Sequence, residues 1–99
     1  MNPDFFLVSE EDAPLKSRID LVPPEALNDV GKVLAFGRAK HGENTWLEVS
    51  SEDHMAAAMR HVNAHQRGIY LDAESQLPHL AHAVCRLMFI VEKQHKRIQ

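Results

Sequence analysis

Cysteine and glycine are scarce in this sequence, and each shortage excludes a class of protein. The single cysteine, Cys85, cannot build an internal disulfide framework or a multi-cysteine zinc site. It fits a reducing compartment, so we expect a cytoplasmic protein. Its apolar neighbours predict a buried, unreactive thiol rather than a nucleophile. The four glycines are too dispersed to form a phosphate-binding loop.

Positive charge and long apolar runs are also missing. The formal net charge is -3, which argues against nucleic acid as the main partner. The sequence has no basic segment followed by a long apolar run, and no apolar stretch long enough to cross a bilayer. We therefore expect neither a signal peptide nor a membrane partner.

Several familiar catalytic signatures are absent as well. There is no His-Asp dipeptide of the kind found in HD-type phosphohydrolases, no Walker loop and no serine hydrolase elbow. The segment 61–65 carries histidines at positions i and i+4, as in a metalloprotease helix. However, Val62 stands where that reaction needs a glutamate. These absences exclude the corresponding reaction classes.

The patterns that are present predict an all-α protein. Apolar residues recur at helical spacing, and no strand-like alternation of useful length occurs. We expect one domain of 99 residues, with an N-terminal arm at 1–22 and main helices at 23–41, 51–67 and 75–96. A chain this short buries a small core. We therefore expect a small bundle of three main helices that oligomerisation completes.

Local signals place the helix ends. The Pro23-Pro24 pair favours a helix start, and Gly42 suits the end of that helix. Ser50 or Ser51 followed by acidic residues predicts the second start, and Gly68 the second stop. The third helix is predicted to turn an apolar stripe toward the core. That stripe comprises Leu77, Leu80, Ala81, Val84, Leu87, Met88 and Val91.

Residues 60–83 crowd together four of the seven histidines. On the second helix, His54, His61 and His65 fall within about 40° of one another. They could form a polar, partly exposed face or face a cleft. On the third helix, His79 and His82 lie opposite the apolar stripe, which would place them in solvent or in a cleft shared by a dimer. Histidines here could bind a metal or carry a proton.

Two blocks of the sequence resemble the dATP/dGTP diphosphohydrolase domain family. The first runs from Arg18-Ile-Asp20 through Pro23-Pro24-Glu25-Ala26-Leu27 and continues at 33–46. The second runs from Ala58-Met-Arg60-His61 to Glu74-Ser75-Gln-Leu77-Pro78-His79-Leu-Ala-His82-Ala83. The match covers roughly residues 16–92 and keeps order and spacing. The resemblance implies an all-α, MazG-like nucleoside triphosphate pyrophosphatase of a kind common in phages and bacteria.

By this resemblance, the protein would hydrolyse a purine deoxynucleoside triphosphate to monophosphate and pyrophosphate with Mg²⁺ or Mn²⁺. We expect a homo-oligomer, either a dimer or a tetramer. Carboxylates suit a hard cation, and arginine and lysine suit phosphate. The metal ligands would be Asp72, Glu74 and Glu25, and the phosphate contacts would be Arg18, Lys40 and Arg60. The catalytic residues would be His61, His79 and His82. Trp46 would stack on the purine.

Each of these residues also has a purely structural alternative. Asp72 and Glu74 could cap a helix, Arg60 could pair with a neighbouring helix, and Trp46 could pack in the core. The chain also departs from the family pattern, with Ile69 and Tyr70 in place of an acidic pair. Gln76 replaces a glycine, Arg86 an asparagine and His41 a tyrosine. The alternative function is a non-catalytic relative that binds a nucleotide or a metal, or acts as an interaction module.

Overall fold

Three helices account for the fold, as the sequence predicted. The structure, a computed structural model, describes residues 15–98; the first fourteen residues of the expected arm lie outside this range. The helices are α1 (Pro24–His41), α2 (Ser51–Gln66) and α3 (His79–Ile98), with short 3-10 turns η2 (Ile19–Leu21) and η3 (Thr45–Leu47). No strand is assigned within residues 15–98. No helix in this part of the chain is long and apolar enough to cross a membrane.

The predicted capping residues mark the first two helices. Pro23 and Pro24 stand at the start of α1, and Gly42 follows its last turn with φ of 92°. The Ser50 hydroxyl accepts a hydrogen bond from the backbone N–H of Asp53 (3.1 Å), which caps α2. Gly68, with φ of 86°, follows the end of α2. Local sequence therefore sets these boundaries.

The third helix begins at His79, four residues later than the sequence suggested. Residues 72–78 instead form a tight turn, in which the Asp72 backbone N–H donates to the Leu77 carbonyl (2.8 Å). The His79 N–H donates back to the Tyr70 carbonyl (2.8 Å), which closes the loop. Pro78 explains the later start, because proline disfavours a helical conformation in the residue before it.

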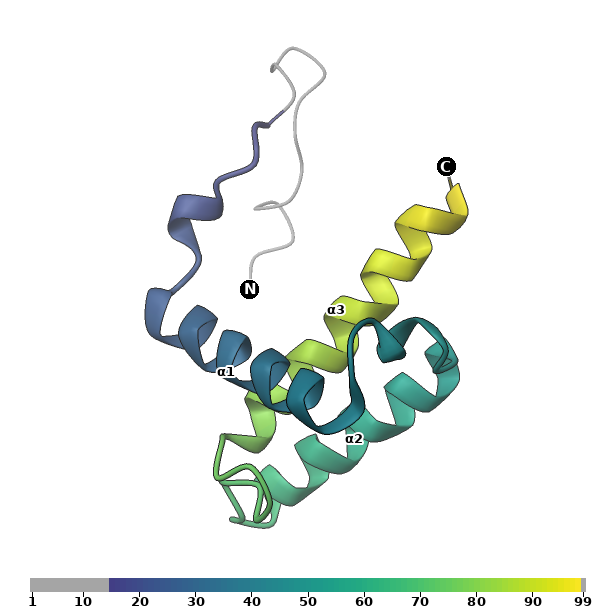
Figure 1. Ribbon diagram of the computed structural model, residues 1–99. Helices are drawn as coiled ribbons and strands as arrows, with labels where there is room; N and C mark the ends of the chain where they lie inside the picture. The colour runs from purple at the N-terminus through teal and green to yellow at the C-terminus, as the bar shows by residue number, and fades with distance from the viewer. Residues whose placement is uncertain (1–14, 99) are drawn as a thin grey trace.

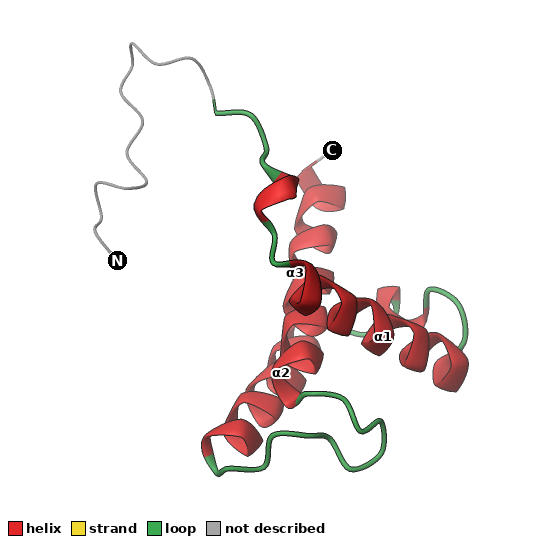
Figure 2. Ribbon diagram, turned by 90° about the vertical axis from the view of Figure 1, so that its left-hand side faces the viewer, coloured by secondary structure: helices red, strands yellow, loops and turns green. Residues whose placement is uncertain are grey.

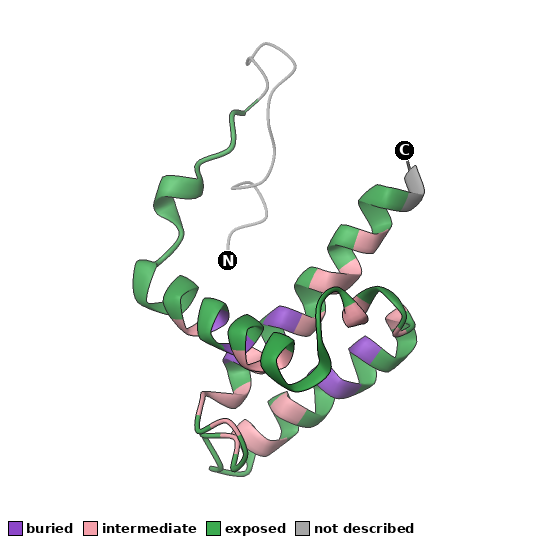
Figure 3. Ribbon diagram, viewed as in Figure 1, coloured by how far each residue is buried: buried purple, intermediate pink, exposed green. Residues whose placement is uncertain are grey.

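Helices α2 and α3 form an antiparallel hairpin, and α1 crosses it near the middle of α3 (Figures 1 and 2). Buried positions gather where the helices meet (Figure 3). Most of them are small: Ala57, Ala58, Ala81, Ala83 and Cys85. Small side chains let helix backbones approach closely, so large side chains are accommodated only at the edges of the contacts between the helices.

The Cys85 thiol is buried against α1, with its sulfur 3.5 Å from the Val30 carbonyl oxygen. Burial raises its pKa to about 11, so the reactive thiolate is scarce at neutral pH. The expectation of an unreactive core cysteine is confirmed.

Only Leu77 and Ala81 of the predicted apolar stripe lie in or against the core; the rest of the stripe does not face it, contrary to the sequence expectation. Its larger members are 40–51% exposed: Leu80, Val84, Leu87, Met88 and Val91. The opposite side of the helix, with His82, Cys85 and Arg86, turns inward instead. The close α2–α3 contact explains this, because only the alanine-rich side of α3 is narrow enough to lie against the alanines of α2.

The turn at Gln76 yields a stability prediction. Gln76 has φ of 60°, the left-handed region, and its side-chain amide donates to the Ala73 carbonyl (2.9 Å). A Cβ in this conformation costs roughly 1–2 kcal/mol. Glycine avoids that cost but loses more chain entropy on folding. We expect Gln76→Gly to raise the free energy of unfolding by roughly 0.5–1 kcal/mol in urea titrations. Gln76→Ala keeps the Cβ and should give no gain; a glycine variant less stable than the parent would contradict this view of the turn.

Candidate active site

A cleft of about 630 Å³ opens between the C-terminal half of α1, the 42–49 loop and the α2–α3 hairpin. Its volume lies within the range of small-molecule sites. One wall carries His61, Asp72 and His82, while Lys40 and Trp46 belong to the other side. The cleft therefore combines metal-ligand types, a cation and an aromatic ring within a single chain.

Three potential metal ligands converge at this wall. One ligand atom each from His61, Asp72 and His79 lies within 4.8 Å of the others, and all three residues are half-buried. The Nδ1 atoms of His61 and His79 are 2.8 Å apart. His82 stacks on the other side of this group, with its ring centroid 4.7 Å from that of His61. Helix α2 supplies His61, and the start of α3 supplies His79 and His82.

The turn before α3 fixes the carboxylate. Oδ2 of Asp72 accepts hydrogen bonds from the backbone N–H groups of Ser75 (2.8 Å) and Glu74 (3.2 Å). Burial would raise the pKa of Asp72, but these Ser75 hydrogen bonds and the nearby His82 outweigh it, so the pKa lies below its usual value. Asp72 is therefore ionised at neutral pH, as a metal ligand must be.

His61 and His82 are held in the neutral form. Burial, reinforced by His82 and His79, lowers the pKa of His61 to about 4. Burial also lowers the pKa of His82, although Asp72 partly opposes it. The Nε2 atom of His82 lies 2.7 Å from the Ser75 hydroxyl oxygen. Neutral imidazoles have a free lone pair, which both metal binding and proton acceptance require.

His54, the first member of the predicted histidine line, is fully buried and has a structural role. Its Nδ1 accepts from the Arg86 guanidinium (3.1 Å), which fixes Nε2 as the donor to the Trp46 carbonyl (2.9 Å). The Phe89 ring lies against His54 and stacks on Trp46 with centroids 4.8 Å apart. His54 thus ties the 42–49 loop to α2 and α3 at the floor of the cleft.

The predicted metal ligands are only partly brought together. Glu74 is exposed and forms an ion pair with Lys40, whose Nζ lies 2.9 Å from Oε2. Glu25 lies in the first turn of α1, about 22 Å along the helix axis from Lys40, and cannot join Asp72 at one ion. Within one chain, the three predicted carboxylates therefore do not come together. Two histidines, His61 and His79, lie where the second and third carboxylates were expected.

Only one of the three predicted phosphate contacts lines the cleft. Lys40 lines the cleft. Arg18 forms a bidentate pair with Asp20 (2.8 and 2.9 Å) on the exposed segment before α1, and the exposed Arg60 is not among the residues lining the cleft. Arg86, which the sequence reasoning did not select for phosphate, lines the cleft instead. Its position one helical turn after His82 was the available signal.

Comparison with known proteins agrees with the sequence blocks. The family model for the N-terminal region of dATP/dGTP diphosphohydrolases matches residues 9–99. The chain belongs to this family. A "dATP/dGTP diphosphohydrolase" of Salmonella phage PMBT28 is 36% identical over 75 residues, covering 76% of this chain and 26% of the relative. The chain thus corresponds to about a quarter of that relative's length. No solved structure matches.

The positions at which this diphosphohydrolase-family chain differs from the family pattern lie in several different environments. Ile69 and Tyr70 are exposed and do not line the cleft, and the Tyr70 ring lies against His65 with centroids 5.0 Å apart. The three-ligand group forms without either position. Gln76 occupies a turn position with positive φ, which explains why glycine suits it. His41 lines the cleft.

The buried His54 gives a testable prediction for this diphosphohydrolase-family fold. We expect His54→Ala to lower the free energy of unfolding by about 2–4 kcal/mol, because it leaves a cavity and removes the partner of Arg86 and of the Trp46 carbonyl. Urea denaturation followed by far-UV circular dichroism measures this loss. The exposed His95→Ala is the matched control and should stay within about 0.5 kcal/mol of the parent. Equal stability of the two variants would contradict the assigned role of His54.

Proposed function

We propose that this protein hydrolyses purine deoxynucleoside triphosphates, dATP or dGTP, to the monophosphate and pyrophosphate with the help of a divalent metal ion. The observation that carries the proposal is the convergence of His61, Asp72 and His79, two of which line a ligand-sized cleft, in a chain of this family. Neutral imidazole nitrogens and an ionised carboxylate are suitable donors for a divalent cation. The donor set thus fits the ion that such a reaction needs.

The charged side chains of the cleft suit a triphosphate. Lys40 can exchange its exposed partner Glu74 for a phosphate oxygen, since a solvent-exposed ion pair is weak. The guanidinium of Arg86 offers further N–H donors beside the one bound to His54. The Trp46 and Phe36 rings, which also line the cleft, are candidates for stacking on the purine. Arg18 and Arg60 are not proposed as phosphate contacts, because neither lines the cleft.

In the proposed reaction, water attacks the α-phosphorus and the bond to the oxygen bridging to the β-phosphate breaks. An ion held by His61, Asp72 and His79 would offset negative charge on the phosphates. His82 is the candidate for accepting the proton of the water. When its Nε2–H donates to the Ser75 hydroxyl, the lone pair on Nδ1 is free to take that proton. Asp72, 4.0 Å from Nε2, stabilises the imidazolium that results.

The activity test uses the purified chain with each deoxynucleoside triphosphate and Mg²⁺ or Mn²⁺, with chromatographic detection of monophosphate and pyrophosphate. We expect turnover of dATP or dGTP, and a kcat for His82→Ala lower by about 10²- to 10⁴-fold. His95→Ala is the control and should keep the parental rate. No turnover by the folded protein would overturn the proposal. Binding of dATP or dGTP without turnover would then identify the non-catalytic relative.

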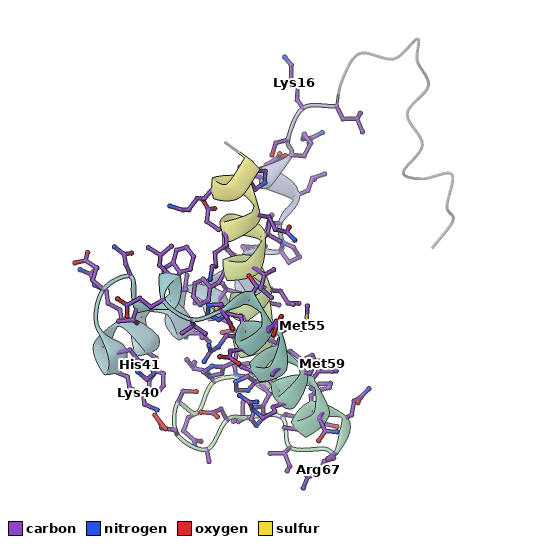
Figure 4. All side chains as sticks on the ribbon, turned by 90° about the vertical axis from the view of Figure 1, so that its right-hand side faces the viewer. Lys16, Lys40, His41, Met55, Met59 and Arg67 are labelled. Atoms are coloured by element: carbon purple, nitrogen blue, oxygen red, sulfur yellow. The ribbon has the colours of Figure 1, made fainter. Side chains whose placement is uncertain are left out.

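We further infer that the protein is a homo-oligomer whose contact is the exposed apolar face of α2 and α3. Met55, Met59 and Val62 on α2 are 37–65% exposed, as is the apolar stripe of α3 described above. Met55 and Met59 point away from the side of the molecule that carries Lys40 and His41 (Figure 4). Large apolar side chains exposed on two neighbouring helices are typical of an interface. A second copy would cover it and leave the cleft open.

Analytical ultracentrifugation tests this contact. We expect a dimer or a tetramer for the parent and a monomer for Val84→Glu, because a buried charge opposes association. Met59→Glu provides a second disruption on the other helix, and Lys32→Glu on exposed α1 is the control that should still associate. Circular dichroism verifies that each variant is folded. A monomeric parent, or an unchanged assembly of both folded glutamate variants, would contradict the inference.

A further inference from the structure

We propose that His61, His79 and Asp72 form a two-histidine, one-carboxylate site that selects a first-row transition-metal ion over magnesium. The proposal names the chemical class of the ion and the three residues that bind it. It shares its location with the proposed function, but it rests on the donor atoms of the site rather than on the reaction.

The spacing of the two imidazoles matches ligands of one ion. With each nitrogen about 2.05 Å from a metal, two neighbouring ligands of an octahedral ion lie about 2.9 Å apart, and two ligands of a tetrahedral ion lie about 3.3 Å apart. The Nδ1 atoms of His61 and His79 are 2.8 Å apart. Their rings are tilted by 42°, with centroids 5.1 Å apart, so they converge through these nitrogens rather than stack. The pair is therefore set in a chelating arrangement.

One oxygen of the Asp72 carboxylate accepts backbone hydrogen bonds, and the other accepts none. Both backbone hydrogen bonds to Asp72 go to Oδ2. Among residues 15–98, no hydrogen bond is made to Oδ1. The hydrogen bond between the two histidines joins their Nδ1 atoms, and Oδ1 of the partly exposed Asp72 is accessible to an ion. An ion between the three residues engages both nitrogens and this oxygen at once.

The surrounding turn holds the ligands in place before any ion binds. Backbone hydrogen bonds from Asp72 to Leu77 and from His79 to Tyr70, each 2.8 Å, close the segment that supplies two of the three ligands. The third, His61, is fixed between the rings of His79 and His82. Ligands ordered in this way lose little conformational freedom on binding, which favours affinity.

The donor types determine which ion is preferred. Magnesium takes oxygen ligands and keeps several waters, whereas imidazole suits zinc, iron, cobalt and nickel. Two of the three donors here are imidazole nitrogens, and the open cleft leaves the other positions to water or phosphate. For such a site, affinity rises from manganese to cobalt. Of the two ions that the family resemblance implied, Mn²⁺ is the first-row transition-metal ion and is expected to bind these imidazoles more tightly than Mg²⁺, although less tightly than Co²⁺.

Isothermal titration calorimetry with the metal salts alone tests the proposal without any substrate. We expect affinity to increase in the order Mg²⁺, Mn²⁺, Co²⁺, with Co²⁺ at least about tenfold tighter than Mg²⁺. We expect His79→Ala to weaken Co²⁺ binding by at least about tenfold, since even residues outside the first coordination shell cost 10–100-fold. His95→Ala removes an exposed histidine of the same helix and should bind Co²⁺ like the parent.

Histidine NMR provides a measurement on the unmodified chain. Zn²⁺ should shift the ring nitrogen signals of His61 and His79 and leave those of buried His54 and exposed His95 unchanged. The proposal is overturned if Mg²⁺ binds as tightly as Co²⁺, if His79→Ala binds Co²⁺ like the parent, or if Zn²⁺ leaves the His61 and His79 signals in place. Because activity is not measured, a protein that binds Co²⁺ but hydrolyses no nucleotide would refute the proposed function and retain the metal site.

Discussion

The close contact between α2 and α3 is the constraint on which the rest of this structure depends. The buried residues of the two helices are mostly alanines, Ala57 and Ala58 on α2 and Ala81 and Ala83 on α3, and small side chains leave little room for large apolar ones. Helix α3 therefore turns its narrow side inward and its leucines outward. His79 and His82 at its start come inward with the narrow side. An apolar outer face and a polar cleft thus have the same origin.

This arrangement also explains the chemistry of the site. Half-buried imidazoles next to one another are driven to the neutral form, and a turn rich in backbone N–H donors keeps one carboxylate ionised. A first-row transition-metal ion is bound by neutral imidazole nitrogens and anionic carboxylate oxygens. The buried His54–Arg86 contact then joins the floor of the cleft to the loop that carries Trp46. Packing, protonation and ligand geometry are therefore coupled.

The helices and their caps could be predicted from sequence because proline, serine and glycine act within one turn of the chain. The start of α3 could not, since the turn at 72–78 depends on hydrogen bonds that no periodicity reveals. Angular positions placed His61 and His82 on sides of their helices that reach the cleft, but they did not separate His61 from the buried His54 or from His65, which lies against Tyr70. They could not show which side of α3 faces inward, because the apolar side gives the stronger signal. The sequence resemblance could not show that Glu25 lies at the far end of α1 from Lys40 and the cleft, because a resemblance carries no distances.

X-ray diffraction at the manganese edge, from crystals of the full chain grown with Mn²⁺, tests the central claim most directly. The account predicts an anomalous peak about 2.0–2.2 Å from Nδ1 of His61, Nδ1 of His79 and an oxygen of Asp72, all three from one chain. A peak coordinated only by Glu74 or Glu25, or an intact His61–His79 hydrogen bond with no metal beside it, would contradict the account.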